Sequence, residues 1–293
     1  ITLTVVEPVM NGIGGDAFAQ VWADGRLHGL NASGRAPAAW NPGRFKGLDA
    51  IPARGWDSVT VPGQVSGWVA LSKRFGALPF ADLFTDAIRH ARDGFPVSPV
   101  IAQQWAQSVR DLHMYPGFEA FMPRGRAPAV GEIWRFADQA DTLADIAATR
   151  GESFYRGRLA QAITGFAAQH GAALSAVDLA NPQADSVEPV AVPFRGHTVH
   201  EIPPNGVGLA ALMALGMLEH LPLEDAPEGC AARLPLAVEA MRLAFADLHT
   251  HVADPAHMHV TAAQLLDSSY LQQRARCINP QRAGQHTAGT PAS

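Results

Sequence analysis

The first forty residues constrain the fold most strongly, because a glycine cluster precedes a hairpin signal. Two short apolar segments, residues 18–22 and 27–30, flank the pair Asp24-Gly25. This turn pair favours a tight hairpin, which makes the two segments antiparallel neighbours in a sheet. Residues 12–15 read Gly-Ile-Gly-Gly. Such glycines allow backbone geometry that other residues avoid, so that a ligand or a second segment can approach closely.

One cation, Arg35, comes directly after this hairpin. Gly34 and Pro37 fix the turn that presents it at the end of the second expected strand. A guanidinium can bind a carboxylate through two parallel hydrogen bonds, and a lysine ammonium cannot. The pattern makes Arg35 a candidate carboxylate-binding residue, and a solvated surface charge is the alternative.

Further short motifs follow in order along almost the whole chain. They occupy residues 12–15, 34–37, 61–63, 67–68, 83–88, 93–98, 151–157, 202–206 and 239–247. Together they resemble the γ-glutamyltranspeptidase family, whose members are N-terminal nucleophile hydrolases. The pair Asn205-Gly206 stands in place of two serines, and it is similar to the transpeptidase-like branch rather than to the main glutathione-degrading enzymes.

The resemblance implies a fold and a reaction. The fold would be an α/β four-layer αββα sandwich, of which this chain supplies the large-subunit part with extra helices. In the family, a threonine released by autocleavage attacks the γ-amide carbonyl, with its own α-amine as the base. Arg35 matches the family arginine that binds the α-carboxylate of the glutamyl donor, a positioning role. No metal and no cofactor are expected.

No catalytic residue is expected within this chain. Thr290 precedes Pro291 in a polar tail and lacks a following strand, and residues 63–67 have the wrong spacing for a serine nucleophile elbow. The resemblance places the threonine a few residues beyond Ser293. We therefore expect a small catalytic subunit led by that threonine as the partner, a γ-glutamyl amide such as glutathione as the substrate, and no activity from this chain alone.

Two other functions stay open. One is an acylase of the same fold that cleaves a glutaryl or cephalosporin side-chain amide, whose terminal carboxylate Arg35 would also bind. The two enzymes differ in whether the other half offers groups for an α-amine. The second is a non-catalytic fragment used for binding or assembly, which the neighbouring coding sequence would distinguish.

Four histidines and one aspartate lie within eleven residues, at His249, His251, Asp254, His257 and His259. Imidazoles and a carboxylate suit zinc or another transition metal. The preceding residues are helical, however, and two side chains at i and i+2 of a helix point in different directions. A surface loop is therefore favoured over a metal site.

One domain is expected over residues 1–283, and a mobile polar tail over residues 284–293. A capping pair is expected at Ser175 and Asp178. Leu248 replaces the arginine that follows Asp247 in the family, which puts an ion pair there in doubt.

Strands are expected over residues 1–6, 187–192 and 198–202, and helices over 80–91, 159–166, 209–218, 234–248 and within 262–277.

Composition bounds the remaining possibilities. A net charge of -5 argues against a nucleic-acid partner, and no apolar run reaches the length of a membrane span. Cys230 and Cys277 could pair, although buried thiols are the commoner outcome. The first residues do not read as a signal peptide, so the compartment stays open, with the cytoplasm slightly favoured over the periplasm or secretion.

Overall fold

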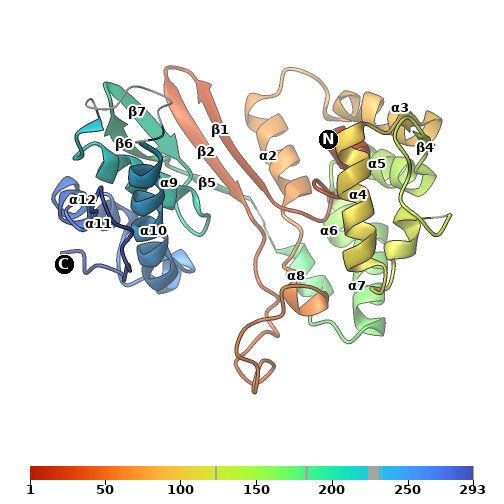
Figure 1. Cartoon of the computed structure of the whole chain (residues 1–293). Coiled ribbons are helices and arrows are strands. Elements are labelled where there is room, and N and C mark those ends of the chain that lie inside the picture. Colours follow the sequence, from red (N-terminus) through yellow and green to blue (C-terminus); the bar gives the residue numbers. More distant parts are fainter. Residues whose placement is uncertain (123, 182–183, 224–230, 232, 293) are drawn as a thin grey trace. The chain divides into compact units, whose positions relative to one another are not determined.

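The computed structural model describes residues 1–122, 124–181, 184–223, 231 and 233–292 (Figure 1). The chain divides into two compact units. Unit 1 comprises Ile1–Ala17 and Ala32–Asp185, and unit 2 comprises Phe18–Asn31 and Ser186–Ser293. The domain boundaries expected from the sequence, 1–283 and 284–293, stay predictions. In the described part of the chain, no helix combines the length and the apolar character that crossing a membrane requires.

Unit 1 is mainly helical. Its short 3₁₀ turns are η1 (Trp56–Ser58), η2 (Phe80–Phe84) and η3 (Phe118–Phe121), and β3 (Phe95–Pro96) pairs antiparallel with β4 (Ile133–Trp134). Its α-helices are α1 (Leu3–Val6), α2 (Gln64–Phe75), α3 (Thr85–Asp93), α4 (Pro99–Leu112), α5 (Ala137–Thr149), α6 (Glu152–Arg156), α7 (Arg158–Gln169) and α8 (Ala176–Ala180).

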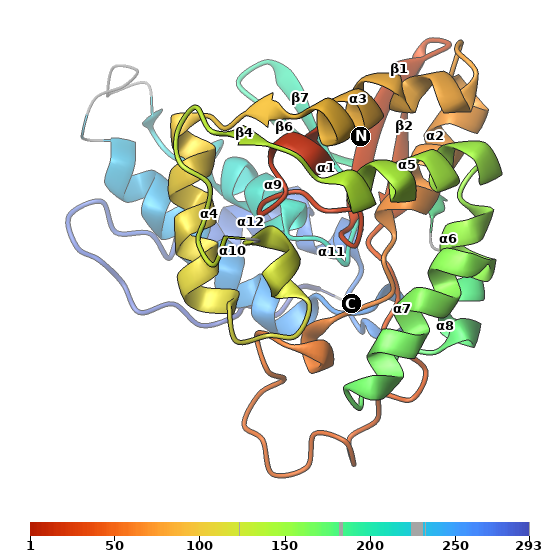
Figure 2. The ribbon, with the colours of Figure 1, turned by 90° about the vertical axis from the view of Figure 1, so that its right-hand side faces the viewer.

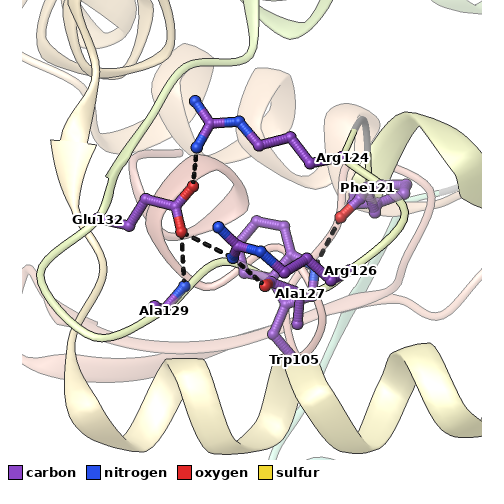
Figure 3. Close-up of polar contacts among 7 residues, drawn as sticks. All are labelled: Trp105, Phe121, Arg124, Arg126, Ala127, Ala129 and Glu132. Carbon is purple, nitrogen blue, oxygen red and sulfur yellow. Dashed lines mark hydrogen bonds and ion pairs between the residues drawn. The ribbon is translucent and has the colours of Figure 1, made fainter.

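The core of unit 1 forms where α3 packs against α5 (Figure 2). Small buried residues on α3, such as Ala87, face a core that contains the fully buried Leu143 and Ile146 of α5. Gly94 ends α3 with a φ of 97°, as the helix-stop pattern predicts. The indole of Trp105 is fully buried, and its Nε1 donates to a backbone carbonyl 2.9 Å away (Figure 3).

A polar cluster of unit 1 fixes the loop between η3 and β4 (Figure 3). The Glu132 carboxylate accepts hydrogen bonds from the Ala129 N–H at 2.8 Å, from Arg126 at 2.9 Å and from Arg124 at 2.7 Å. The Ala129 N–H and the Arg126 guanidinium hold the pKa of Glu132 below its usual range. This carboxylate is therefore engaged in shaping the loop.

Unit 2 contains two small sheets and a group of helices. The strands β1 (Ala17–Ala23), β2 (Arg26–Ala32) and β5 (Asp185–Val187) form one sheet in the order β1-β2-β5, with a few end residues counted in unit 1. The strand β6 (Val190–Phe194) pairs antiparallel with β7 (His197–Glu201). The helices are α9 (Gly208–Leu218), α10 (Arg233–His251), α11 (Ala262–Leu265) and α12 (Ser268–Ala275), with η5 (Pro255–His257) between α10 and α11.

The predicted hairpin is confirmed. Strands β1 and β2 are paired neighbours, and the turn residues Asp24 and Gly25 have φ angles of 51° and 75°. Two successive residues in the left-handed region are the geometry of a tight two-residue hairpin turn. The predicted helices over 209–218 and 234–248 correspond to α9 and α10, which pack side by side (Figure 1).

Two element predictions are wrong. The first segment forms the helix α1 rather than a strand, because a helical turn buries Val5 completely and lets the Thr4 hydroxyl donate to the Ile1 carbonyl at 2.8 Å. Short apolar runs do not distinguish a strand from a buried helix. Val187 belongs to β5 and not to the β6 pair. The last helix, α12, lies within residues 262–277 as predicted, and the Asp267 side chain caps its start at Ser268.

The cysteine expectation needs a correction as well. Cys277 is exposed, whereas a buried thiol was the favoured expectation. It lies two residues after the end of α12, and its Sγ lies 3.8 Å from the Gln273 carbonyl oxygen, four residues earlier. Cys230 lies outside the described residues.

Candidate functional site

Three glycine-bearing segments of unit 1 meet at the N-terminus of α2. The Gly15 N–H donates to the Gly12 carbonyl at 3.0 Å, which closes the first segment into a turn. The Gly15 carbonyl then accepts hydrogen bonds from the backbone N–H groups of Gly63 at 3.1 Å and Gln64 at 3.0 Å. The Gln64 amide also donates to the Asn11 side chain at 3.0 Å. The glycine-rich loop is thereby fixed to the start of a long helix.

The turn before Arg35 is held by backbone contacts that admit only glycine. Gly34 has a φ of 69°, and a Cβ built on it would lie 1.8 Å from the Val61 carbonyl oxygen. A Cβ on Gly63 would lie 2.1 Å from the Ala32 carbonyl oxygen. The Val61 N–H donates to the Arg35 carbonyl at 2.9 Å. The backbone of the candidate substrate-binding residue is therefore fixed by close packing of two chain segments.

The Arg35 side chain is exposed and lies against a carboxylate. Its Nη2 lies 2.8 Å from Oδ2 of Asp185, and the two side chains are 61% and 58% exposed. Asp185 opens strand β5, 150 residues further along the chain. The sequence pattern identified Arg35 as a candidate but did not identify Asp185, because the residues around an aspartate do not indicate a partner so far away in the sequence.

Asp178 supports the segment that follows Arg35. Its carboxylate accepts from the Ala38 N–H at 2.9 Å and from the Ser175 N–H at 2.9 Å. The capping box predicted for Ser175 and Asp178 is present at the start of α8. Burial favours the neutral acid, but the hydrogen bonds from Ser175 and Ala38 outweigh it and lower the pKa of Asp178. An ionised carboxylate thus anchors the chain three residues after Arg35.

An apolar pocket of ≈ 670 Å³ lies beside the glycine-rich loop within unit 1. It shares Ile13, Gly14 and Pro62 with the loop and its partner segment. Its volume falls in the range of pockets that bind small organic molecules. Most of the remaining lining is apolar or aromatic and includes Trp56, Tyr115, Phe118, Phe121 and Ile163.

The histidines of the predicted cluster do not converge on one point. His249 and His251 lie in the last turn of α10, and His257 lies in η5. The His251 ring nitrogen lies 2.9 Å from the Gly289 carbonyl oxygen. Within the ranges that the structure describes, no group of three or more histidine, cysteine, aspartate or glutamate side chains is placed to hold a metal ion.

Two acidic residues hold the polar tail, and the sequence pattern assigned no such role to either of them. The buried Glu239 accepts from the Gly284 N–H at 2.8 Å and contacts the His286 ring. The fully buried Asp247 accepts from the Gly289 N–H. The sequence does contain one signal for these contacts, because the two carboxylates lie eight residues apart on a helix face that is otherwise apolar. Carboxylates on such a face are rarely buried without partners. Mobility of the tail stays a prediction.

Comparison with known proteins extends the resemblance. The family model described as Gamma-glutamyltranspeptidase matches residues 1–292. The chain is 34% identical over 280 residues to the glutathione hydrolase-like YwrD proenzyme of Bacillus subtilis, covering 94% of this chain and 53% of that protein. The chain thus spans about half the length of the curated relatives that it matches.

Solved structures show the same likeness. Cephalosporin acylase from Bacillus halodurans superposes with a TM-score of 0.93 at 42% identity, over 99% of this chain and 55% of that chain. Gamma-glutamyltranspeptidase from Pseudomonas nitroreducens superposes with a TM-score of 0.89 at 27% identity, over 97% of this chain and 86% of that chain. The resemblance seen in the sequence motifs is confirmed, and this chain belongs to the γ-glutamyltranspeptidase family.

Proposed function

We propose that this chain is the large-subunit portion of an amide hydrolase or acyltransferase whose acyl donor carries a terminal carboxylate, bound by Arg35. The observation that carries this proposal is the position of Arg35. It follows a turn in which only glycine fits at position 34, and its guanidinium is exposed. Such a guanidinium is suited to two parallel hydrogen bonds with a carboxylate. The complete protein would form the αββα sandwich of the family.

The chemistry would reside in a small catalytic subunit led by a threonine. Its hydroxyl attacks the amide carbonyl while its α-amine takes the hydroxyl proton and passes it to the leaving amine. The resulting acyl ester is then cleaved by water or transferred to an acceptor amine. Arg35 makes no bond to the reacting atoms, and its role is to orient the donor.

A γ-glutamyl amide such as glutathione is the first donor class. A glutaryl or cephalosporin-type amide is the second, and two observations favour it. Of the two solved structures described above, cephalosporin acylase has the higher sequence identity to this chain. The apolar pocket next to the glycine-rich loop could also take a bulky apolar group of the substrate.

The test is to produce this chain together with the threonine-led portion and to measure hydrolysis of γ-glutamyl-p-nitroanilide and glutaryl-p-nitroanilide. Turnover of either compound by the two portions, and of neither by the 293-residue chain alone, is the expected result. Turnover of neither by the assembled protein would instead favour a non-catalytic binding or assembly role. Turnover by this chain alone would show that the nucleophile lies within it.

A further inference from the structure

A small, partly enclosed pocket of ≈ 150 Å³ is formed by the segment 124–135 of unit 1. Three arginines line it, Arg124, Arg126 and Arg135, and Glu132 is the acidic residue of the lining. Arg124 and Arg126 come from the loop before β4, and Arg135 directly follows that strand. Because three guanidinium groups surround one carboxylate, the lining carries an excess of two positive charges.

The contacts of these arginines leave hydrogen-bond donors for a ligand. Glu132 accepts from Nη1 of Arg124 at 2.7 Å and from Nη1 of Arg126 at 2.9 Å (Figure 3). Arg135 donates from its Nε to the Asp93 carbonyl at 3.1 Å. Each of these hydrogen bonds uses one nitrogen, and a guanidinium carries N–H groups on each of its nitrogens. The remaining N–H groups can therefore donate to an anion in the pocket.

Trp134 adds an N–H group that lacks an acceptor in the described part of the chain. The residue lines the pocket and is only 6% exposed. Its Nε1 is buried and has no hydrogen-bond partner among the described residues, whereas Nε1 of the adjacent Trp105 donates to the Phe121 carbonyl at 2.9 Å. Most buried N–H groups in proteins are paired, because an unpaired one costs free energy. An oxygen atom of a bound ligand would supply the missing acceptor.

From these observations we propose that the pocket binds a small, doubly charged tetrahedral oxyanion of the phosphate class. Arginines donate parallel hydrogen bonds to such groups, and a doubly charged ion matches the excess charge of the lining. The pocket is well below the about 300–1,000 Å³ of sites that hold drug-sized molecules, so it takes a single oxyanion or the end of a phosphate ester. No lining residue belongs to the glycine-rich loop or to the Arg35 turn, and the proposal does not depend on the proposed function.

The experiment is a titration of the isotope-labelled 293-residue chain with inorganic phosphate, followed through the indole N–H signals of its tryptophans by NMR. The Trp134 signal is the one that is missing from the spectrum of Trp134→Phe. Phosphate should shift this signal in a saturable way, and acetate, which carries a single charge, should shift it less. A Trp134 signal that phosphate leaves unchanged would overturn the proposal.

Arg126→Gln and Arg156→Gln are a matched pair of variants for calorimetric titration with phosphate. The two arginines are 51% and 50% exposed, and each binds a glutamate and a backbone carbonyl. Only Arg126 lines the pocket. Arg126→Gln should bind phosphate about three- to ten-fold more weakly than the wild type, and Arg156→Gln should bind it equally well. Equal affinities of the two variants would show that phosphate does not bind in this pocket.

Arg135→Gln separates binding from the shape of the loop. Arg126 also holds Glu132, so that its loss could act by releasing the loop. Arg135 donates to the Asp93 carbonyl instead, and its replacement should weaken phosphate by a similar factor. Wild-type affinity of Arg135→Gln would contradict a site built from these arginines.

Methyl phosphate distinguishes the two sources of the oxyanion. Affinity equal to that of inorganic phosphate assigns the pocket to the end of a phosphate ester, and a weaker affinity assigns it to the free ion. Both results support a phosphate site, provided that the arginine variants behave as expected.

Discussion

The carboxylate of Asp247 on α10 accepts a hydrogen bond from Nε of Arg274 on α12 at 3.0 Å, and the two side chains are 0% and 8% exposed. The family pattern would place the arginine directly after Asp247, where this chain has Leu248. The structure supplies a guanidinium from 27 residues further on. Arg274 also donates to the Thr287 carbonyl at 2.7 Å, so the pair fixes the polar tail to α10 and α12 within unit 2.

Replacing Asp247 by alanine should destabilise unit 2 strongly. The change leaves the buried guanidinium of Arg274 without its charge partner, which costs about 3–5 kcal/mol. The free energy of unfolding measured in urea reports the loss. Amide exchange at Gly289 should accelerate as well, because its N–H donates to the same carboxylate.

Asp86→Ala is the control for this experiment. Asp86 forms an ion pair with Arg89 at 3.1 Å, with side chains 74% and 55% exposed, and its loss should cost no more than about 1 kcal/mol. Equal losses of unfolding free energy for Asp86→Ala and Asp247→Ala would show that burial does not make the Asp247–Arg274 pair more important for stability than an exposed pair.

Glu239 should make the stability of the chain depend on pH in the acid range. The N–H of Gly284, then His286 and Arg242, lower the pKa of its carboxyl from 4.5 to about 2. A folded-state pKa below the unfolded value contributes stability that is fully present above pH 4.5 and is lost as the pH falls toward 2. Glu239→Gln should therefore unfold at a urea midpoint that falls less steeply than that of the wild type between these two pH values.

The comparison of slopes decides this prediction, because other carboxylates protonate in the same range in both proteins. Parallel midpoint curves for the wild type and Glu239→Gln would mean that the carboxylate does not hold the tail in solution.

Gly34→Ala should be far more damaging than alanine at another glycine with the same backbone angle. Gly125 also has a φ of 69°, but nothing lies within 4 Å of a Cβ built there. Gly125→Ala should cost about 1 kcal/mol for the left-handed conformation alone. Gly34→Ala adds a clash with the Val61 carbonyl and should cost more than about 3 kcal/mol in urea unfolding. Similar losses would show that the close approach of the two segments is absent in solution.

Substitutions of Arg35 should weaken the assembled two-portion enzyme in a graded way. Arg35→Lys keeps the charge and loses the fork, and Arg35→Ala leaves the donor carboxylate unpaired, which costs on the order of 2–5 kcal/mol in kcat/KM. Lysine should be the milder change. A donor without the terminal carboxylate is the control, and wild type and Arg35→Ala should cleave it almost equally. An equal loss with both donors would make Arg35 a residue of the turn and not of the site.

Local patterns in the sequence determined several features correctly. The Asp24-Gly25 turn, the end of α3 at Gly94 and the capping box of Ser175 and Asp178 are all present. Each depends on residues within a few positions of one another, so that neighbouring side chains and backbone angles suffice to specify it. The ordered motifs likewise identified the family and, through it, Arg35 as a candidate site residue.

Only the tertiary structure decided which distant groups meet. Asp185 lies against Arg35, and Gly284 donates to Glu239 from 45 residues away. Leu3–Val6 is helical because the helix buries Val5 in the core of unit 1, which the six residues at the start of the sequence do not reveal by themselves. Charge pairing and burial depend on the packing of whole elements, and packing brings together side chains whose sequence separation carries no signal.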